Sequence, residues 1–166
     1  MFEHVGLSQL ADYFERCHAL LGPQGRFVNH GISQPAHMPI ATHGRFARRG
    51  LGRDFTERYV FPDGELHEVG SVVSAIQAAG FEVRHVESLR EHYALTCAAW
   101  CRNLDAHWDE AVAEVGMGTA RVWGLYMAGS RLGFERNVVQ LHQVLAVKAD
   151  KAGGSVDLPL RPWWQP

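Results

Sequence analysis

The order of helix-like and strand-like segments constrains the fold of this chain most strongly. Residues 7–21 place apolar side chains at helical spacing until a Gly-Pro turn ends the pattern. Residues 26–32 then alternate as a strand does, which predicts a buried strand directly after the helix. Three side chains share one face of this strand: Val28, His30 and Ile32. A helix, a tight turn and a strand in this order predict an α/β fold.

The same order recurs further along the chain. A short helix is predicted over residues 71–79, and a strand follows over residues 81–86. Two longer helices with aromatic faces are predicted over 93–115 and 122–132. A last strand is predicted over 138–147, with one apolar face formed by Val139, Leu141, Leu145 and Val147. The sequence thus predicts three strands.

Composition excludes several classes of protein. The 166 residues fit one domain, and a net charge of −2 argues against a protein that wraps nucleic acid. No apolar run approaches the roughly 20 residues that cross a bilayer, and the first residues do not resemble a signal peptide. Three cysteines are too few for a disulfide scaffold. We therefore expect a cytoplasmic protein that does not bind nucleic acid.

One segment, residues 33–58, shows no periodicity and is expected to form a basic loop inserted in a domain that spans 1–149. It holds five arginines and two acidic residues. A solvated loop and a loop that contacts anionic lipid head groups are both consistent with this composition. Residues 150–166 are expected to form an extended tail.

Residues that could carry chemistry lie next to the predicted elements. Glu3 precedes the first helix, His30 and Ile32 end the first strand, and Tyr93 opens a long helix. A carboxylate, an imidazole and a phenol could orient a small anion or relay a proton. Two other interpretations remain open: Glu3 as a helix cap, and His30 as a hydrogen-bonded core residue.

A metal site is not predicted, although the chain has ten histidines. Cys97 and Cys101 lie one helical turn apart, and His92 and His107 fall on the same predicted helix. Their spacing does not match a zinc site, and Trp100 between the cysteines indicates packing.

Several blocks of sequence occur together in an order that resembles a known family. In chain order these are Met-Phe-Glu-His-Val-Gly at 1–6, Leu-Leu-Gly-Pro-Gln-Gly at 20–25, Phe-Val-Asn-His-Gly-Ile at 27–32, Tyr-Val-Phe-Pro-Asp-Gly-Glu-Leu at 59–66, His-Tyr-Ala-Leu-Thr at 92–96 followed by Trp100, and the segments 121–134 and 140–147. The chain resembles the carboxyl-terminal half of the cyclopropane-fatty-acyl-phospholipid synthases and the related mycolic acid cyclopropane synthases. The resemblance covers nearly all of residues 1–148.

The resemblance implies a Rossmann-like class I methyltransferase fold and S-adenosylmethionine as the methyl donor. It implies methyl transfer to the cis double bond of a phospholipid acyl chain, at the inner membrane surface, followed by proton loss and cyclopropane ring closure. A bound bicarbonate ion is implied as the base, held by Glu3, His30, the Ile32 backbone and Tyr93. Glu3, His30 and Tyr93 are the implied catalytic residues. Aromatic side chains that suit an acyl channel are Trp100, Trp123 and Tyr126, and packing in the core remains an open interpretation of each.

The sequence also departs from the family pattern. The family's glycine-rich turn after a strand has no match, because Gly50-Leu51-Gly52 follows no predicted strand. The family's acidic residue that binds the ribose and its cysteine near the anion have no match either. The resemblance therefore implies a chain that lacks the N-terminal cofactor-binding strands. It could be a truncated product, a half that pairs with a cofactor-binding chain, or the result of a misplaced start. We expect the uncovered sheet to associate with itself or with a partner.

Overall fold

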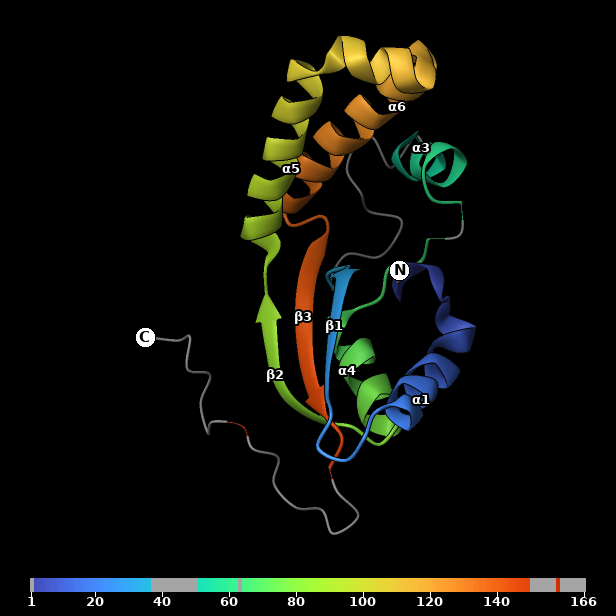
Figure 1. Cartoon of the computed structure of the whole chain (residues 1–166), viewed down its shortest axis with the longest axis vertical. Helices are drawn as coiled ribbons and strands as arrows, with labels where there is room; N and C mark the ends of the chain where they lie inside the picture. The colour runs from blue at the N-terminus through green and yellow to red at the C-terminus, as the bar shows by residue number, and fades with distance from the viewer. Residues whose placement is uncertain (1, 37–50, 63, 150–157, 159–166) are drawn as a thin grey trace.

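A computed structural model describes residues 2–36, 51–62, 64–149 and 158 of this protein. Three strands form one antiparallel sheet in the order β1-β3-β2 (Figure 1). They are β1 (Arg26–Ser33), β2 (Glu82–Ser88) and β3 (Gln140–Val147). All three lie where the sequence predicts strands, and the mixed α/β class is confirmed.

The helices lie before and between the strands. Two short 3-10 helices, η1 (Phe2–His4) and η2 (Leu7–Gln9), precede α1 (Leu10–Leu20). Between β1 and β2 lie α3 (Leu51–Tyr59) and α4 (Val69–Ala78). Between β2 and β3 lie α5 (Arg90–Ala106) and α6 (Trp108–Glu135).

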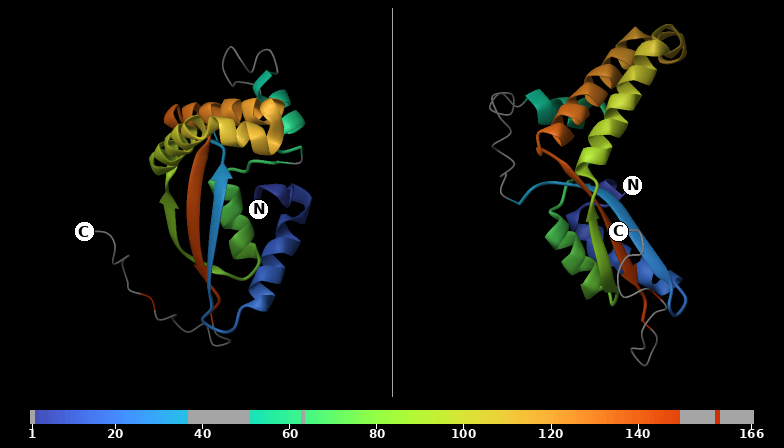
Figure 2. Two further views of the ribbon diagram at one scale, coloured as in Figure 1. Left: turned by 45° about the horizontal axis from the view of Figure 1, so that its top comes forward. Right: turned by 90° about the vertical axis from the view of Figure 1, so that its left-hand side faces the viewer.

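Helices α1 and α4 cover one face of the sheet (Figure 2). Phe14 of α1 and Ile76 of α4 are completely buried, and they belong to one cluster with Val144 and Ala146 of β3. Burying a large apolar side chain contributes about 1.5–3 kcal/mol. This layer therefore holds the sheet and the two helices together as one core.

Helices α5 and α6 form an arm that extends beyond the end of the sheet, at the top of Figure 1. Gly116 has φ 80° and ψ 156°, so α6 consists of two helical segments joined by a residue whose conformation suits glycine. At the base of the arm Cys97 of α5 and Phe134 of α6 are buried in one cluster with Leu141 of β3. This second cluster fixes the arm to the sheet.

The sheet face opposite α1 and α4 is called the open face below. Side chains alternate along β1, so Asn29, Gly31 and Ser33 point toward the helices and are buried, whereas Val28 is 54% exposed and His30 is exposed as well. A shallow depression of about 100 Å³ on the open face is lined by Val28, His85, Glu87, Gln143 and Leu145. The prediction that β1 is buried is therefore wrong for one of its faces. The face that carries Val28 and His30 is the open face.

Two further predictions about local structure are wrong. The segment 33–58 is not without regular structure, because Ser33 ends β1 and α3 begins at Leu51. Phe55 and Tyr59 lie one helical turn apart, with ring centroids 5.4 Å apart, and the surrounding arginines and glycines hide that spacing in the sequence. Residues 37–50 of this segment lie outside the described residues, as does the predicted tail apart from Leu158.

The long helix predicted over 93–115 is divided at His107. The backbone of His107 leaves the helical conformation, and its Nδ1 atom lies 2.9 Å from the carbonyl oxygen of Asn103. The same Asn103 carbonyl oxygen accepts a hydrogen bond of 3.1 Å from the His107 amide, so both the backbone and the side chain of His107 contact the last turn of α5. Apolar periodicity continues across this break, so it does not reveal the end of the helix.

Candidate functional site

Glu3 connects the start of the chain to the end of β1. Its carboxylate accepts a hydrogen bond from the Ile32 amide, with 2.7 Å between Oε1 and the nitrogen. Its carbonyl oxygen accepts a hydrogen bond of 2.9 Å from the Glu65 amide. Glu3 therefore binds two segments far apart in sequence. The N-cap residue of α1 is Gln9, and no side chain caps the helix there. The interpretation of Glu3 as a cap of the first long helix is wrong.

The Glu3 carboxylate is half-buried and ionised. Burial raises its pKa, but the lowering contributions, led by the hydrogen bond from the Ile32 amide, outweigh it and leave the pKa below its ordinary value. The site therefore contains a carboxylate that accepts hydrogen bonds and has no proton to donate at neutral pH.

His30 and Tyr93 come together from β1 and α5. Their ring centroids are 6.0 Å apart. The Tyr93 ring also packs edge-on against Phe134 at 5.0 Å and Trp100 at 5.8 Å, so the base of the arm determines where its hydroxyl lies. His30 is exposed and is not a core histidine. The structure thus brings His30 and Tyr93 into contact. His30 lies two residues before Ile32, which binds Glu3, along β1.

Two tyrosine hydroxyls near this site stay protonated at neutral pH. Burial raises the pKa of Tyr93, and the charges of neighbouring groups, Glu3 among them, raise it further. Burial also raises the pKa of Tyr126 on α6, and the Glu3 charge again adds to the rise. Both hydroxyls can therefore donate hydrogen bonds within the electrostatic reach of Glu3. The sequence places Tyr126 on an aromatic helix face and does not predict its proximity to Glu3.

An aromatic row extends from this site into the arm. Its successive ring pairs are His4 and Phe61 at 5.2 Å, Phe61 and Tyr126 at 5.6 Å, and Tyr126 and Trp123 at 5.6 Å. Trp123 remains 38% exposed and Trp100 remains 43% exposed. The aromatic residues predicted for an acyl channel therefore lie on the arm, next to the site, with accessible surface.

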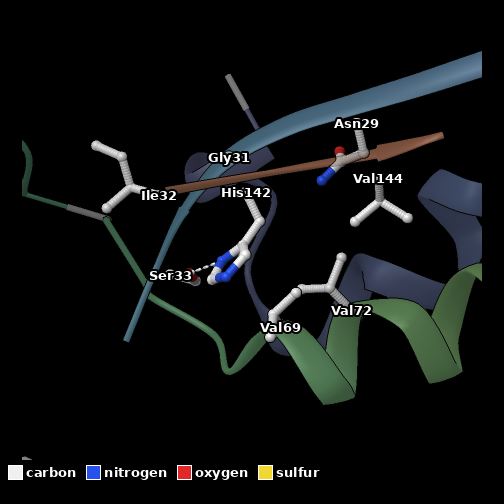
Figure 3. Close-up of a pocket in the computed structure, with 8 residues that line it drawn as sticks. All are labelled: Asn29, Gly31, Ile32, Ser33, Val69, Val72, His142 and Val144. Atoms are coloured by element: carbon white, nitrogen blue, oxygen red, sulfur yellow. Dashed lines mark hydrogen bonds between the residues drawn. The ribbon is translucent and has the colours of Figure 1, made fainter. Parts of the chain in front are cut away.

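A polar cluster on the opposite side of β1 is closed by α4 (Figure 3). Ser33 Oγ lies 2.7 Å from Nδ1 of His142, and Val69 and Val72 of α4 face the pair. The cavity there measures about 10 Å³, which is the space of one water molecule. This cluster joins β1 to β3 beneath the helices and has no room for a substrate.

No group of three His, Cys, Asp or Glu side chains in the described ranges is arranged to hold a metal ion. The three cysteines are free thiols, and Cys97 and Cys101 belong to α5. In the same part of the chain, no helix combines the length and apolar character needed to cross a bilayer.

Comparison with known proteins assigns the chain to a family. The model of the mycolic acid cyclopropane synthetase family matches residues 1–144. The chain belongs to this family. The resemblance predicted from the sequence blocks is confirmed, and members of the mycolic acid cyclopropane synthetase family are S-adenosylmethionine-dependent methyltransferases of the cyclopropane synthase type.

Two curated relatives cover almost the whole chain. It is 49% identical over 164 residues to a probable fatty acid methyltransferase, Rv3720, of Mycobacterium tuberculosis, and 44% identical over 161 residues to a probable fatty acid methyltransferase of Pseudomonas putida. These matches cover 99% and 96% of the chain but only 36% and 39% of the relatives. The chain thus spans less than two fifths of the length of either.

Solved structures of the family show the same arrangement. The mycolic acid cyclopropane synthase CmaA1, complexed with SAH and CTAB, matches with a TM-score of 0.80 at 27% identity. The cyclopropane synthase MmaA2 from Mycobacterium tuberculosis matches with a TM-score of 0.75 at 26% identity. Each match covers 89% of this chain and 52% of the other. The α/β fold is therefore that of the family's methyltransferases, over about half of their length.

We expect the polar cluster of Ser33 and His142 to make the fold less stable in acid. Burial lowers the pKa of His142 in the folded chain, so unfolding lets this residue bind a proton more readily. The free energy of unfolding should be unaffected by His142 above the ordinary histidine pKa of about 6.5 and should fall as the pH drops below it. Urea unfolding at pH 8 and pH 5, followed by tryptophan fluorescence, measures this fall.

A matched pair of variants isolates the contribution of His142. His142→Gln should show a smaller loss of stability between pH 8 and pH 5 than the wild type, because it removes the group that resists protonation. His92→Gln, at an exposed position of α5, should behave as the wild type does. Equal losses in His142→Gln and the wild type would show that His142 does not titrate with unfolding.

Proposed function

We propose that this chain forms the anion-binding and acyl-binding part of an S-adenosylmethionine-dependent methyltransferase that acts on unsaturated acyl chains of membrane phospholipids and forms a cyclopropane ring. One observation carries the proposal: at the junction of β1 and the arm, the Glu3 carboxylate binds the Ile32 amide, and the His30 and Tyr93 rings contact each other with Tyr93 in electrostatic reach of Glu3. The family membership of the chain supports the methyl-transfer chemistry.

The polar groups of this junction fit a bicarbonate ion. The hydroxyl of bicarbonate can donate a hydrogen bond to the Glu3 carboxylate, which only accepts. The protonated Tyr93 hydroxyl and an N–H of His30 can donate to the other oxygens. When bound, bicarbonate supplies a base that removes a proton from a carbocation. Glu3, His30 and Tyr93 would hold and orient that base.

The described residues offer no comparable set of groups that could hold S-adenosylmethionine. In the described residues, β2 leads into α5 through Leu89 with no glycine-rich turn, and the glycines at 50 and 52 follow no predicted strand. When bound, S-adenosylmethionine supplies the methyl group.

The arm suits the acyl part of the substrate. Trp100, Trp123 and Tyr126 offer apolar faces beside the junction, and aromatic faces also stabilise a nearby cation. Leu95 and Leu125, on α5 and α6, are 71% and 66% exposed. Exposed apolar side chains on a projecting arm support contact with lipid at the cytoplasmic surface of a membrane.

The anion site is tested by measuring bicarbonate binding to the chain. We expect Tyr93→Phe to weaken binding about tenfold, because it removes one hydrogen bond to a charged group, worth about 1.5 kcal/mol. Tyr59→Phe is the matched control, since Tyr59 is exposed on α3 and its ring packs against Phe55. Carbon-13 NMR of labelled bicarbonate measures the affinity, and equal affinities for Tyr93→Phe and the wild type would contradict the site.

A second candidate function is favoured by the open face and by the edge of β1. In a strand, the amides of alternate residues point to the same edge, so the amides of Val28 and His30 point away from β3, as the Ile32 amide does. Among the described residues β1 pairs in the sheet with β3 alone, apart from one isolated bridge between Ser33 and His67. The chain could therefore be a non-catalytic half that binds a separate cofactor-binding segment, or a second copy, along this edge.

Titration with S-adenosylmethionine tests the second candidate. The second predicts no measurable heat with the chain alone, and binding once the part of the Pseudomonas putida relative that the chain does not match is added. Val28→Lys should abolish this gain, because a charge would then lie on the covered face, whereas Leu20→Lys, at an 88% exposed position of α1, should not. Binding of S-adenosylmethionine by the chain alone would rule out the second candidate.

A further inference from the structure

Gln143 contacts His30 on the open face, from the neighbouring strand. The two residues are partners in the register of β1 and β3, and Nε2 of Gln143 lies 3.1 Å from Nδ1 of His30. They are 113 residues apart in sequence, and the contact joins a residue of the proposed anion site to one that neither the sequence blocks nor the family assignment gives a role.

The chemistry of this contact determines where the imidazole proton lies. The Nε2 group of a glutamine is a hydrogen-bond donor and cannot accept. Nδ1 of His30 must therefore be the acceptor, which requires a lone pair on that nitrogen. In a neutral imidazole only one nitrogen carries a proton, so the proton of His30 lies on Nε2.

We propose that Gln143 is a positioning residue that holds His30 as the neutral Nε2–H tautomer. The side-chain amide of Gln143 keeps the lone pair on Nδ1 of His30 turned toward itself. The role of this tautomer in the reaction rests on the proposed function. The Nε2–H group of His30 can then donate a hydrogen bond to the anion beside Tyr93.

The tautomer matters because a carbocation can react with the lone pair of an accessible imidazole nitrogen. An imidazole nitrogen is a good nucleophile, and a bond between it and the cationic carbon would end the reaction on the protein. With the proton on Nε2, the nitrogen that faces the anion has no lone pair to offer. His30 also stays uncharged in this tautomer, so it adds no positive charge next to a cationic intermediate.

Two other titratable groups share the depression with Gln143. His85 and Glu87 of β2 line it, and Glu87 is the register partner of Gln143 on the side away from β1. All spectra are therefore compared at one pH, pH 8, so that the charges of His85 and Glu87 do not vary between measurements of one variant.

Nitrogen-15 NMR of the histidine rings tests the proposal on the full chain without cofactor, anion or lipid. Long-range proton–nitrogen correlation spectra distinguish a protonated ring nitrogen from one with a lone pair, and the spectrum of His30→Gln identifies the His30 signals among the ten histidines. We expect a single Nε2–H tautomer in the wild type. Gln143→Leu should give a mixture of both tautomers, because leucine can neither donate nor accept.

Gln143→Glu gives the opposite expectation. A carboxylate accepts and does not donate, so it should move the His30 proton to Nδ1. Gln140→Leu is the matched control on the same strand, since Gln140 donates to Asn137 at 2.8 Å and should leave the His30 spectrum unchanged. An Nδ1–H tautomer in the wild type, or a His30 spectrum that none of the Gln143 variants alters, would overturn the proposal.

This experiment remains decisive if the proposed function fails. The tautomer is read with no methyl donor, bicarbonate or acyl chain present, so the loss of bicarbonate binding or of methyl transfer cannot produce the expected change. Conversely, Tyr93→Phe can abolish bicarbonate binding while the His30 tautomer stays as in the wild type.

Discussion

The hydrogen bond from the Ile32 amide to the Glu3 carboxylate fixes the end of β1, and the candidate site depends on that position. One edge of β1 is held by β3 along its whole length. The other edge has no strand partner in the described part of the chain, and Glu3 takes the Ile32 amide there. His30 lies two residues earlier on the same face, so fixing Ile32 also places the imidazole next to Tyr93.

The alternation of β1 separates structural and chemical roles. Ser33 and its partner His142 lie beneath α4 and join β1 to β3 in a closed cluster (Figure 3). His30 and its partner Gln143 lie on the open face, where groups remain accessible. A shift of one residue in the register would exchange these two faces. The two buried clusters at either end of the sheet therefore also protect the geometry of the site.

Much of this fold could be predicted from residue patterns, because the strands and most helices carry clear apolar periodicity. The exceptions have physical causes: the α3 sequence contains few apolar residues, and the apolar periodicity continues across the backbone break at His107 that ends α5. For the site, Glu3, His30 and Tyr93 follow from residue type and family resemblance. The contact of His30 with Gln143 depends on the pairing of β1 with β3, and the proximity of Tyr126 to Glu3 depends on how the arm packs. Neither can be read from local sequence.

A crystal structure of the chain grown in bicarbonate would test most directly whether the junction of β1 and the arm is an anion site. We expect planar, trigonal density within hydrogen-bond distance of the Tyr93 hydroxyl, His30 Nε2 and the Glu3 carboxylate, with Glu3 still bound to the Ile32 amide. If Glu3, His30 and Tyr93 keep these positions and no such density lies between them, the junction does not bind the ion, and the proposed role of these residues is wrong.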